Sequence, residues 1–268
     1  MLNLAPGEVH LWLSYYDRFA DTGLPYGYHA LLTDEEHAQM ARFYFERDRL
    51  RYRVTRALVR TTLSRYAPVA PAEWRFVTNH YGRPAIADRH GDACALRFNV
   101  SHTHSLIVLA VSRDAEVGVD VENVVQRAAP IEIADRFFSR DEATELGTLA
   151  PERQQHRFFE YWTLKESYIK ARGMGLSIPL DKFTFSYPSD ATVVLDTDPD
   201  LDPAPQRWTF WQLQPDPAYL VSLCLEQRQT DAPRLVLQPA LPQFAGPLAA
   251  APVELDTALR RRSPSRSS

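Results

Sequence analysis

Cysteine is scarce in this sequence of 268 residues, which holds only Cys94 and Cys224 and no C-x-x-C pair. That scarcity excludes a disulfide framework and a cysteine-based zinc site, and it is typical of free thiols in a reducing compartment. The first residues lack a basic start followed by an apolar run, so no signal peptide is indicated. We therefore expect a cytoplasmic protein.

Long apolar runs and an excess of positive charge are also missing. The longest strongly apolar stretch, Leu106–Val111, is far too short to span a bilayer, so we expect no membrane partner. The net charge of −4 argues against a protein that coats nucleic acid. With 45% hydrophobic and 24% charged residues, the chain suits one large soluble domain or two small ones, each with a buried core.

The patterns along the chain predict two halves with a similar order of elements. Each half begins with a strand, continues through helices and closes with an apolar hairpin, at residues 98–112 and 208–226. A turn separates the halves, so we place an N-terminal subdomain at residues 1–114 and a C-terminal subdomain at 115–228. The predicted fold class is α+β, a pseudo-twofold pair of similar α/β subdomains in one chain. Residues 229–268, rich in proline and alanine, are predicted to be a disordered tail with solvated arginines at its end.

A helix that begins near Pro151-Glu152 and runs through Trp162 is predicted as the central element. It ends at Gly173 and Gly175, where a glycine can adopt the left-handed turn that closes a helix. Glu166 and Lys170 are four residues apart and lie on one face, with Trp162 one turn earlier. One interpretation is a weak surface ion pair beside a core tryptophan. The other is a functional face above a glycine-rich exit.

Residues 117–122 read V-G-V-D-V-E, a strict alternation that predicts a strand. The valines face one side, and Asp120 and Glu122 face the other, with their carboxylates about 7 Å apart along the strand. Like charges so placed need a compensating cation or wide solvent exposure. With Glu166 they form three hard oxygen ligands, a set that favours Mg²⁺ over zinc and indicates a phosphate-bearing substrate. The alternative is the polar face of a half-exposed strand.

An amphipathic helix is predicted over residues 47–63, with basic side chains away from its apolar stripe. The arginines of its basic face are Arg49, Arg53, Arg56 and Arg60. They form either a solvated surface or an anion site, because clustered guanidinium groups match phosphate geometry. His102, between two apolar strands, either donates a hydrogen bond to a phosphate or caps its turn.

Four motifs occur in a fixed order. They are Gly82-Arg83-Pro84, Phe98-Asn99-Val100-Ser101-His102, Gly118-Val119-Asp120-Val121-Glu122, and the stretch from Trp162 to Leu176 with its K-E-x-x-x-K core. This set closely resembles the 4′-phosphopantetheinyl transferases of the larger surfactin-synthetase-activating type, over about residues 34–226. Two departures are Arg83, where the family usually has lysine, and Thr103, where it usually has serine.

The resemblance implies the fold of that family, with coenzyme A in a cleft between the halves. Asp120, Glu122 and Glu166 resemble its magnesium ligands. Residues that resemble contacts of coenzyme A are Arg51 at the 3′-phosphate, Arg83, Pro84, Ser101, the phosphate-contacting His102, Lys165, and Lys170 at the transferred phosphate. Glu166 is the implied base for the serine proton, and Glu142, which follows the F-F-S-R segment, is a second candidate.

The implied activity is Mg²⁺-dependent transfer of the 4′-phosphopantetheine arm of coenzyme A to a serine of an acyl or peptidyl carrier protein, with release of adenosine 3′,5′-bisphosphate. A two-halved chain is expected to be a monomer, since the family's half-length synthases assemble as trimers. Exposed apolar residues near Phe137 and Phe138 are a candidate docking surface for the carrier. Two other classes stay open: a metal-dependent phosphohydrolase with the same carboxylates, and a non-catalytic module that binds coenzyme A.

Overall fold

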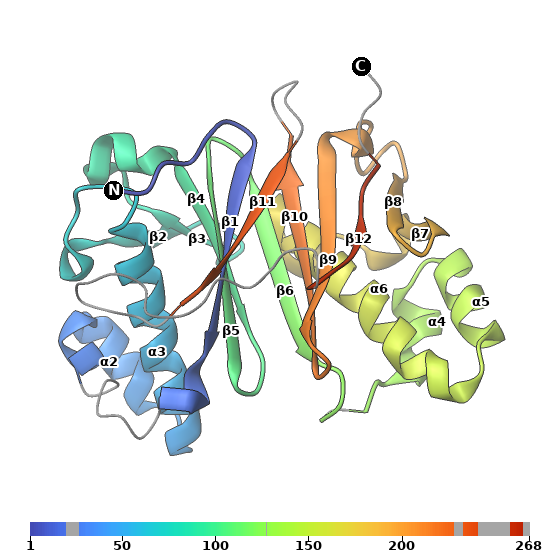
Figure 1. Cartoon of the computed structure of the whole chain (residues 1–268), viewed down its shortest axis with the longest axis horizontal. Helices are drawn as coiled ribbons and strands as arrows, with labels where there is room; N and C mark the ends of the chain where they lie inside the picture. The colour runs from blue at the N-terminus through green and yellow to red at the C-terminus, as the bar shows by residue number, and fades with distance from the viewer. Residues whose placement is uncertain (20–26, 127, 228–232, 241–257, 265–268) are drawn as a thin grey trace.

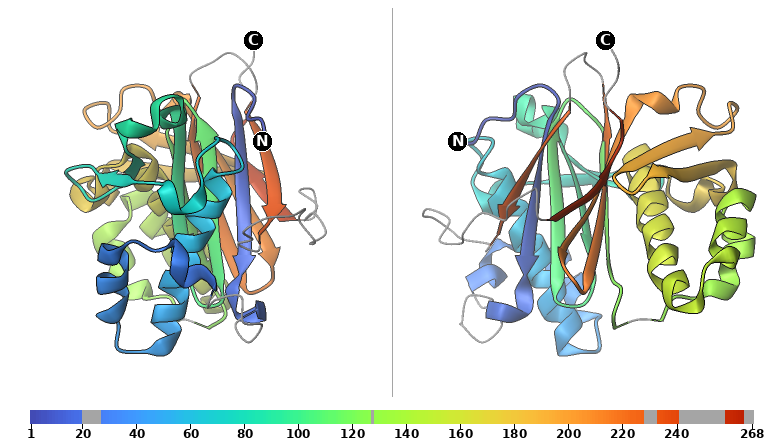
Figure 2. Two further views of the ribbon diagram at one scale, coloured as in Figure 1. Left: turned by 90° about the vertical axis from the view of Figure 1, so that its left-hand side faces the viewer. Right: turned by 45° about the vertical axis from the view of Figure 1, so that its right-hand side comes forward.

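Two β-sheets pack face to face in the middle of the molecule, and helices cover the outer side of each sheet (Figures 1 and 2). The structure, a computed structural model, describes residues 1–19, 27–126, 128–227, 233–240 and 258–264. Three apolar clusters follow from this layering. One lies between the sheets, and one lies between each sheet and its helices.

The first sheet has the strand order β11-β1-β5-β4. Its strands are β1 (Glu8–Tyr15), β4 (Leu96–His102), β5 (Leu106–Arg113) and β11 (Arg234–Pro239). Helices α2 (Asp34–Ala41) and α3 (Glu46–Leu63) cover its outer face, and a small separate hairpin is formed by β2 (Phe76–Thr78) and β3 (Pro84–Ile86).

The second sheet has the order β6-β10-β9-β12-β8-β7. Its strands are β6 (Val117–Asn123), β7 (Phe183–Ser189), β8 (Thr192–Thr197), β9 (Trp208–Asp216), β10 (Tyr219–Glu226) and β12 (Leu259–Arg262). Its helices are α4 (Ala134–Phe137), α5 (Arg140–Thr148) and α6 (Pro151–Arg172), which ends at Gly173 in the left-handed region as predicted.

The two halves repeat one topology. In each, the first strand (β1 or β6) pairs antiparallel with the last (β5 or β10), which pairs with the strand before it (β4 or β9). This repeat confirms the predicted α+β pair of similar subdomains. Strand β5 ends at Arg113 in one sheet and β6 begins at Val117 in the other. A boundary at residue 114 remains the division that we propose.

Gly118 sets how closely α6 approaches β6. The alternation predicted for this strand is present, because Val117, Val119 and Val121 lie in the core between the sheets and leave Gly118 facing the helix. A Cβ atom on Gly118 would lie 2.0 Å from the backbone oxygen of Ser167. Any side chain there would therefore hold the helix away from the strand.

One arginine of the basic face of α3, Arg60, has a structural role that differs from both alternatives considered from the sequence. A capping box begins α2, with Thr33 and Glu36 exchanging side-chain and backbone hydrogen bonds. The carboxylate of Glu36 then pairs with Arg60 at 2.8 Å and with Arg56 at 3.6 Å. Arg60 is buried, and it also donates to the backbone oxygen of Trp74. This arginine is therefore a structural counter-ion.

The C-terminal segment corrects the prediction of a disordered tail over residues 229–268. Residues 234–239 form β11, parallel to β1, and residues 259–262 form β12, which joins β9 to β8. Their apolar side chains enter the core between the sheets, and Arg262 donates to the backbone oxygen of Pro233, so that the two pieces meet. Residues 229–232, 241–257 and 265–268 of that predicted tail lie outside the described part of the chain.

The predicted solvation of the terminal arginines is wrong for Arg261, which is 6% exposed. Its guanidinium donates to Glu160 of α6 at 2.7 Å and to Gln212 of β9 at 2.9 Å. Burial alone would raise the pKa of Glu160. The hydrogen bond to His156 and the charges of Arg261 and Arg157 outweigh it and lower that pKa to about 2. The tail therefore supplies a counter-ion to the central helix.

Among the helices of the described residues, none is long and apolar enough to cross a membrane.

We predict that Gly118→Ala lowers the free energy of unfolding by about 3 kcal/mol or more, because its Cβ would overlap backbone atoms that cannot move independently. Urea unfolding measures the change. The matched control is Gly147→Ala, since nothing lies within 4 Å of a Cβ at that exposed position in α5. Alanine favours a helix more than glycine, so this control should be neutral or stabilising. Equal stability of Gly118→Ala and wild type would contradict the close approach.

We predict that Arg261→Met also destabilises the protein, by about 2 kcal/mol at pH 7, because it leaves Glu160 buried with fewer cations. The pKa of Glu160 is about 2 in the folded protein and near 4.5 in the unfolded chain. The ionised carboxylate therefore stabilises the fold fully at pH values above 4.5, and this stabilisation is lost as the pH falls toward 2. The stability difference from wild type should therefore shrink between pH 7 and pH 3 in urea unfolding. Arg234→Met, at the exposed start of β11, is the control and should have no effect.

Candidate active site

A cavity of about 610 Å³ lies where α3 and α6 face the ends of β4 and β6. All but three of the site residues expected from the sequence line it, and they come from both halves of the chain. The lining residues are Phe43, Asp48, Arg51, Tyr52, Thr55, Arg56, Pro84, Val100, Ser101, His102, Asp120, Val121, Glu122, Trp162, Glu166 and Lys170. We refer to this cavity as the cleft.

Asp120 and Lys170 form the central ion pair of the cleft. The Lys170 ammonium lies 2.6 Å from Asp120 Oδ1, and Ser101 Oγ donates to the same oxygen at 2.9 Å. Asp120 Oδ2 is buried and has no hydrogen-bond partner among the residues that the structure describes. One interpretation of the sequence was a surface ion pair between Glu166 and Lys170. In the structure Lys170 pairs with Asp120 of β6 instead.

Glu166 and Trp162 share the face of α6 that carries Lys170, as their spacing predicts. Burial raises the pKa of Glu166, and the charge of Asp120 raises it further, while Lys170 opposes both. Glu122 also lines the cleft, one strand pleat beyond Asp120. The three carboxylates expected to gather around a cation therefore face one cavity.

Carboxylates that line one cavity need not lie close enough together to bind one metal ion. Within the described ranges, no three His, Cys, Asp or Glu side chains are gathered tightly enough to form one. In this structure the Lys170 ammonium holds one oxygen of the Asp120 carboxylate. The donor set still consists of oxygens alone, with one buried oxygen left unpartnered, and such a set fits Mg²⁺ better than zinc.

The first half contributes a histidine and two arginines of α3 to the cleft. Desolvation lowers the pKa of His102, and the charges of Arg51 and Lys170 lower it further, so its imidazole is neutral near pH 7. The Arg51 guanidinium is held by Asp48 at 3.0 Å, one turn earlier on the helix. Arg51 and Arg56 therefore bring positive charge opposite the carboxylates of the second half.

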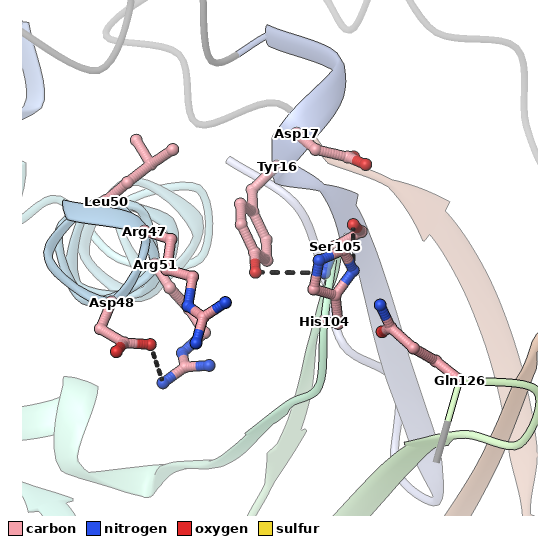
Figure 3. Close-up of a pocket in the computed structure, with 9 residues that line it drawn as sticks. All are labelled: Tyr16, Asp17, Arg47, Asp48, Leu50, Arg51, His104, Ser105 and Gln126. Atoms are coloured by element: carbon pink, nitrogen blue, oxygen red, sulfur yellow. Dashed lines mark hydrogen bonds and ion pairs between the residues drawn. The ribbon is translucent and has the colours of Figure 1, made fainter. Parts of the chain in front are cut away.

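A second cavity of about 510 Å³ adjoins the cleft, and Figure 3 shows the side chains around it. Arg47 and Arg51 extend into it from α3, opposite the β4–β5 turn that carries His104 and Ser105. Asp48 and Arg51 line both cavities. A phosphate held by Arg51 would therefore lie at their junction.

Arg83 does not line the cleft. Its guanidinium donates to the backbone oxygens of Ala171 at 2.7 Å and Val117 at 3.0 Å, and it pairs with Glu116 at 2.8 Å. It thus ties the hairpin of the first half to the end of α6 and the start of β6. The structure thus gives Arg83 a role as a clamp between the halves, and its contact with coenzyme A stays a prediction; the neighbouring Pro84 faces the cleft.

Lys165 and Glu142 are also outside the cleft, which corrects both of their expected roles. The Lys165 ammonium is fully buried, 2.7 Å from Glu142 Oε2, and it donates to the backbone oxygens of Leu180 and Phe183. Burial raises the pKa of Glu142 and lowers that of Lys165, and their mutual attraction opposes both shifts. An ion pair so enclosed cannot exchange a proton with a substrate in the cleft.

Sequence reasoning missed several residues on the cleft side of α3. Asp48, Tyr52 and Thr55 line the cleft together with Arg51. Their spacing from one another is that of one helix face, so Arg51 was the signal that could have identified them. The sequence analysis considered the arginine face of this helix as the anion site and did not extend it to these neighbours of Arg51. Phe138 is likewise corrected, because it is buried in the core and only Phe137 is exposed.

We predict that Lys165→Met lowers the free energy of unfolding by about 3–5 kcal/mol, because Glu142 would stay buried without its counter-ion. The double variant Glu142→Gln/Lys165→Met should recover part of that loss in urea unfolding. Lys182→Met, which removes an exposed pair with Asp198, is the control with an expected change near zero. A fully stable Lys165→Met that no longer binds coenzyme A would overturn the structural role.

Comparison with known proteins identifies the family. A family model described as "4′-phosphopantetheinyl transferase superfamily" matches residues 116–224, and another described as "4′-phosphopantetheinyl transferase, N-terminal" matches residues 27–114. The 4′-phosphopantetheinyl transferase HetI of a Nostoc species is 33% identical over 215 residues, which is 80% of this chain and 86% of HetI.

The 4′-phosphopantetheinyl transferase Sfp of Bacillus subtilis is 32% identical over 195 residues, covering 73% of this chain and 82% of Sfp. A crystal structure of the Thermotoga maritima holo-[acyl-carrier-protein] synthase aligns with 42% of this chain and 64% of its own, at 24% identity and a TM-score of 0.35. The matches to both halves and to near full-length relatives confirm the resemblance of the four motifs: the chain belongs to the 4′-phosphopantetheinyl transferase superfamily.

Proposed function

We propose that this protein transfers the 4′-phosphopantetheine group of coenzyme A to a serine of an acyl or peptidyl carrier protein and releases adenosine 3′,5′-bisphosphate. The observation that carries the proposal is one cleft in which three carboxylates and Lys170 of the second half face Arg51 and His102 of the first. A ligand with a diphosphate and a separate phosphate matches that distribution of charge. The names of the relatives HetI and Sfp support the same activity.

In this proposal the first half holds the nucleotide. Arg51 binds the 3′-phosphate, because it is fixed by Asp48 and stands where the two cavities meet. His102, neutral near pH 7, offers a hydrogen bond to a phosphate oxygen without adding charge. Arg56 lines the same cleft and adds a further cation.

The second half holds the diphosphate. Asp120, Glu122 and Glu166 would hold Mg²⁺, and the unpartnered Oδ2 of Asp120 fits this role. When bound, the ion neutralises negative charge on the diphosphate oxygens. Lys170 would contact the phosphate to be transferred, because its ammonium already lies in the cleft.

The chemical step is a phosphoryl-type transfer. The oxygen of the carrier serine forms a bond to the β-phosphorus of coenzyme A, and the bond from that phosphorus to the bridging oxygen breaks. The electron pair leaves with the 5′-phosphate of adenosine 3′,5′-bisphosphate. Glu166 accepts the serine proton, because its carboxylate lines the cleft on the face of α6 that carries Lys170. Positioning and charge neutralisation account for most of the rate.

Fatty-acid, polyketide and nonribosomal-peptide carriers all meet these requirements. We propose that the protein acts in the cytoplasm as a monomer, since both halves of the cleft come from one chain. Phe137, which is exposed and stands at the end of α4, remains a candidate contact for the carrier.

We predict that Asp120→Ala and Glu166→Ala each reduce transfer of a fluorescent coenzyme A analogue to a purified apo-carrier protein by at least about 100-fold, because each removes a proposed ligand of the cation that neutralises the diphosphate. In-gel fluorescence measures the labelled carrier. Far-ultraviolet circular dichroism checks that each variant is folded.

Asp141→Ala is the matched control, because Asp141 is an exposed acid on α5 outside the cleft. It should label the carrier as wild type does. Normal labelling by both cleft variants would disprove the assignment of the carboxylates. Release of phosphate from coenzyme A with no carrier present would indicate a phosphohydrolase, and binding without turnover would indicate a non-catalytic module.

A further inference from the structure

Ser101 occupies a bridging position between the two halves. It lies near the end of β4 in the first sheet, and its side chain is buried against β6 and α6 of the second half. Its hydroxyl donates to Asp120 Oδ1 at 2.9 Å and accepts from the Lys170 ammonium at 3.0 Å. The donor and one acceptor site of this hydroxyl are therefore already used inside the protein.

The two oxygens of Asp120 are in different situations as a result. Oδ1 accepts from both Ser101 and Lys170, whereas Oδ2 is buried and unpartnered among the described residues. A carboxylate that is fixed at one oxygen presents the other in a defined direction. Oδ2 is therefore the oxygen left for a cation, and the donors on Oδ1 decide where it points.

Ser101 is the more rigid of these two donors. Lys170 holds its ammonium on a long chain with several rotatable bonds, and in the proposed reaction it must also contact a phosphate. Ser101 has a single side-chain rotor and stands on a strand paired with β5, opposite Val108. Two residues earlier, the side chain of Asn99 accepts from the backbone N–H of Val119 at 2.9 Å, which fixes β4 against β6 beside Asp120.

We infer that Ser101 is a positioning residue for the cation, which acts by orienting Asp120, and that its hydroxyl is not a contact of coenzyme A as the family resemblance implied. This inference rests on the proposed magnesium site. Partners in such an outer layer matter, because their loss typically weakens metal binding by about 10–100-fold even though they never touch the ion.

The test measures Mn²⁺ binding to the full-length protein by electron paramagnetic resonance, with no coenzyme A present. Ser101→Ala should bind Mn²⁺ about 10-fold more weakly than wild type. Ser101→Thr keeps the hydroxyl and should bind within about threefold of wild type, a rescue that lost stability alone would not produce. Calorimetric binding of coenzyme A in the presence of EDTA should be the same for Ser101→Ala and wild type.

Ser112→Ala is the matched control. Ser112 is a buried serine on the neighbouring strand β5, and its hydroxyl donates to the backbone oxygen of Ala115 at 2.7 Å, away from the cleft. This variant loses a comparable internal hydrogen bond, and it should keep the Mn²⁺ affinity of the wild type.

Two results would overturn the positioning role while leaving the proposed function intact. One is wild-type Mn²⁺ affinity in Ser101→Ala. The other is weaker binding of coenzyme A in EDTA with unchanged Mn²⁺ affinity, which would make Ser101 a direct contact of the nucleotide. If the wild-type protein itself binds no Mn²⁺, the proposed magnesium site fails, and the role of Ser101 fails with it.

Discussion

The close approach of α6 to β6 is the constraint on which the rest of the site depends. It exists because Gly118 has no side chain to separate the helix from the strand. At that distance Lys170 reaches Asp120 from the helix, and Glu166 lies near enough for the two carboxylates to repel. A helix displaced by the width of one methyl group would lose this geometry. The absence of a side chain at Gly118 therefore determines how closely Lys170 and Glu166 approach Asp120.

Polar contacts from the first half then fix that helix and strand in place. Arg83 and Asn79 bond to the backbone at the end of α6, and Asn99 and Ser101 bond to β6 and its carboxylate. The halves are thus connected by side chains as well as by the apolar core between the sheets. The cleft is built across this junction, so the side chains that line it come from both halves of the chain.

Local periodicity in the sequence was sufficient to predict most of the fold. It also predicted which faces of β6 and α6 contribute side chains to the cleft. The alternation around Asp120 and the four-residue spacing of Glu166 and Lys170 were reliable, because they follow from strand and helix geometry. Lys165 could not be assigned in this way. It neighbours Glu166 in the motif, but it points to the opposite side of α6, toward a partner 23 positions away in the sequence. Strands β11 and β12 pair with β1 and β9, which lie far earlier in the chain. A local sequence pattern cannot identify so distant a pairing partner.

The place of β12 also governs the order in which the second sheet can assemble. Among the described strands, β12 lies between β9 and β8 and so connects the hairpin of β7 and β8 to the rest of the sheet. Strand β12 follows every other strand of that sheet in the chain, so this connection can form only after residues 259–262 have been synthesised. Until then the facing edges of β9 and β8 would be unpaired and open to pairing with another chain.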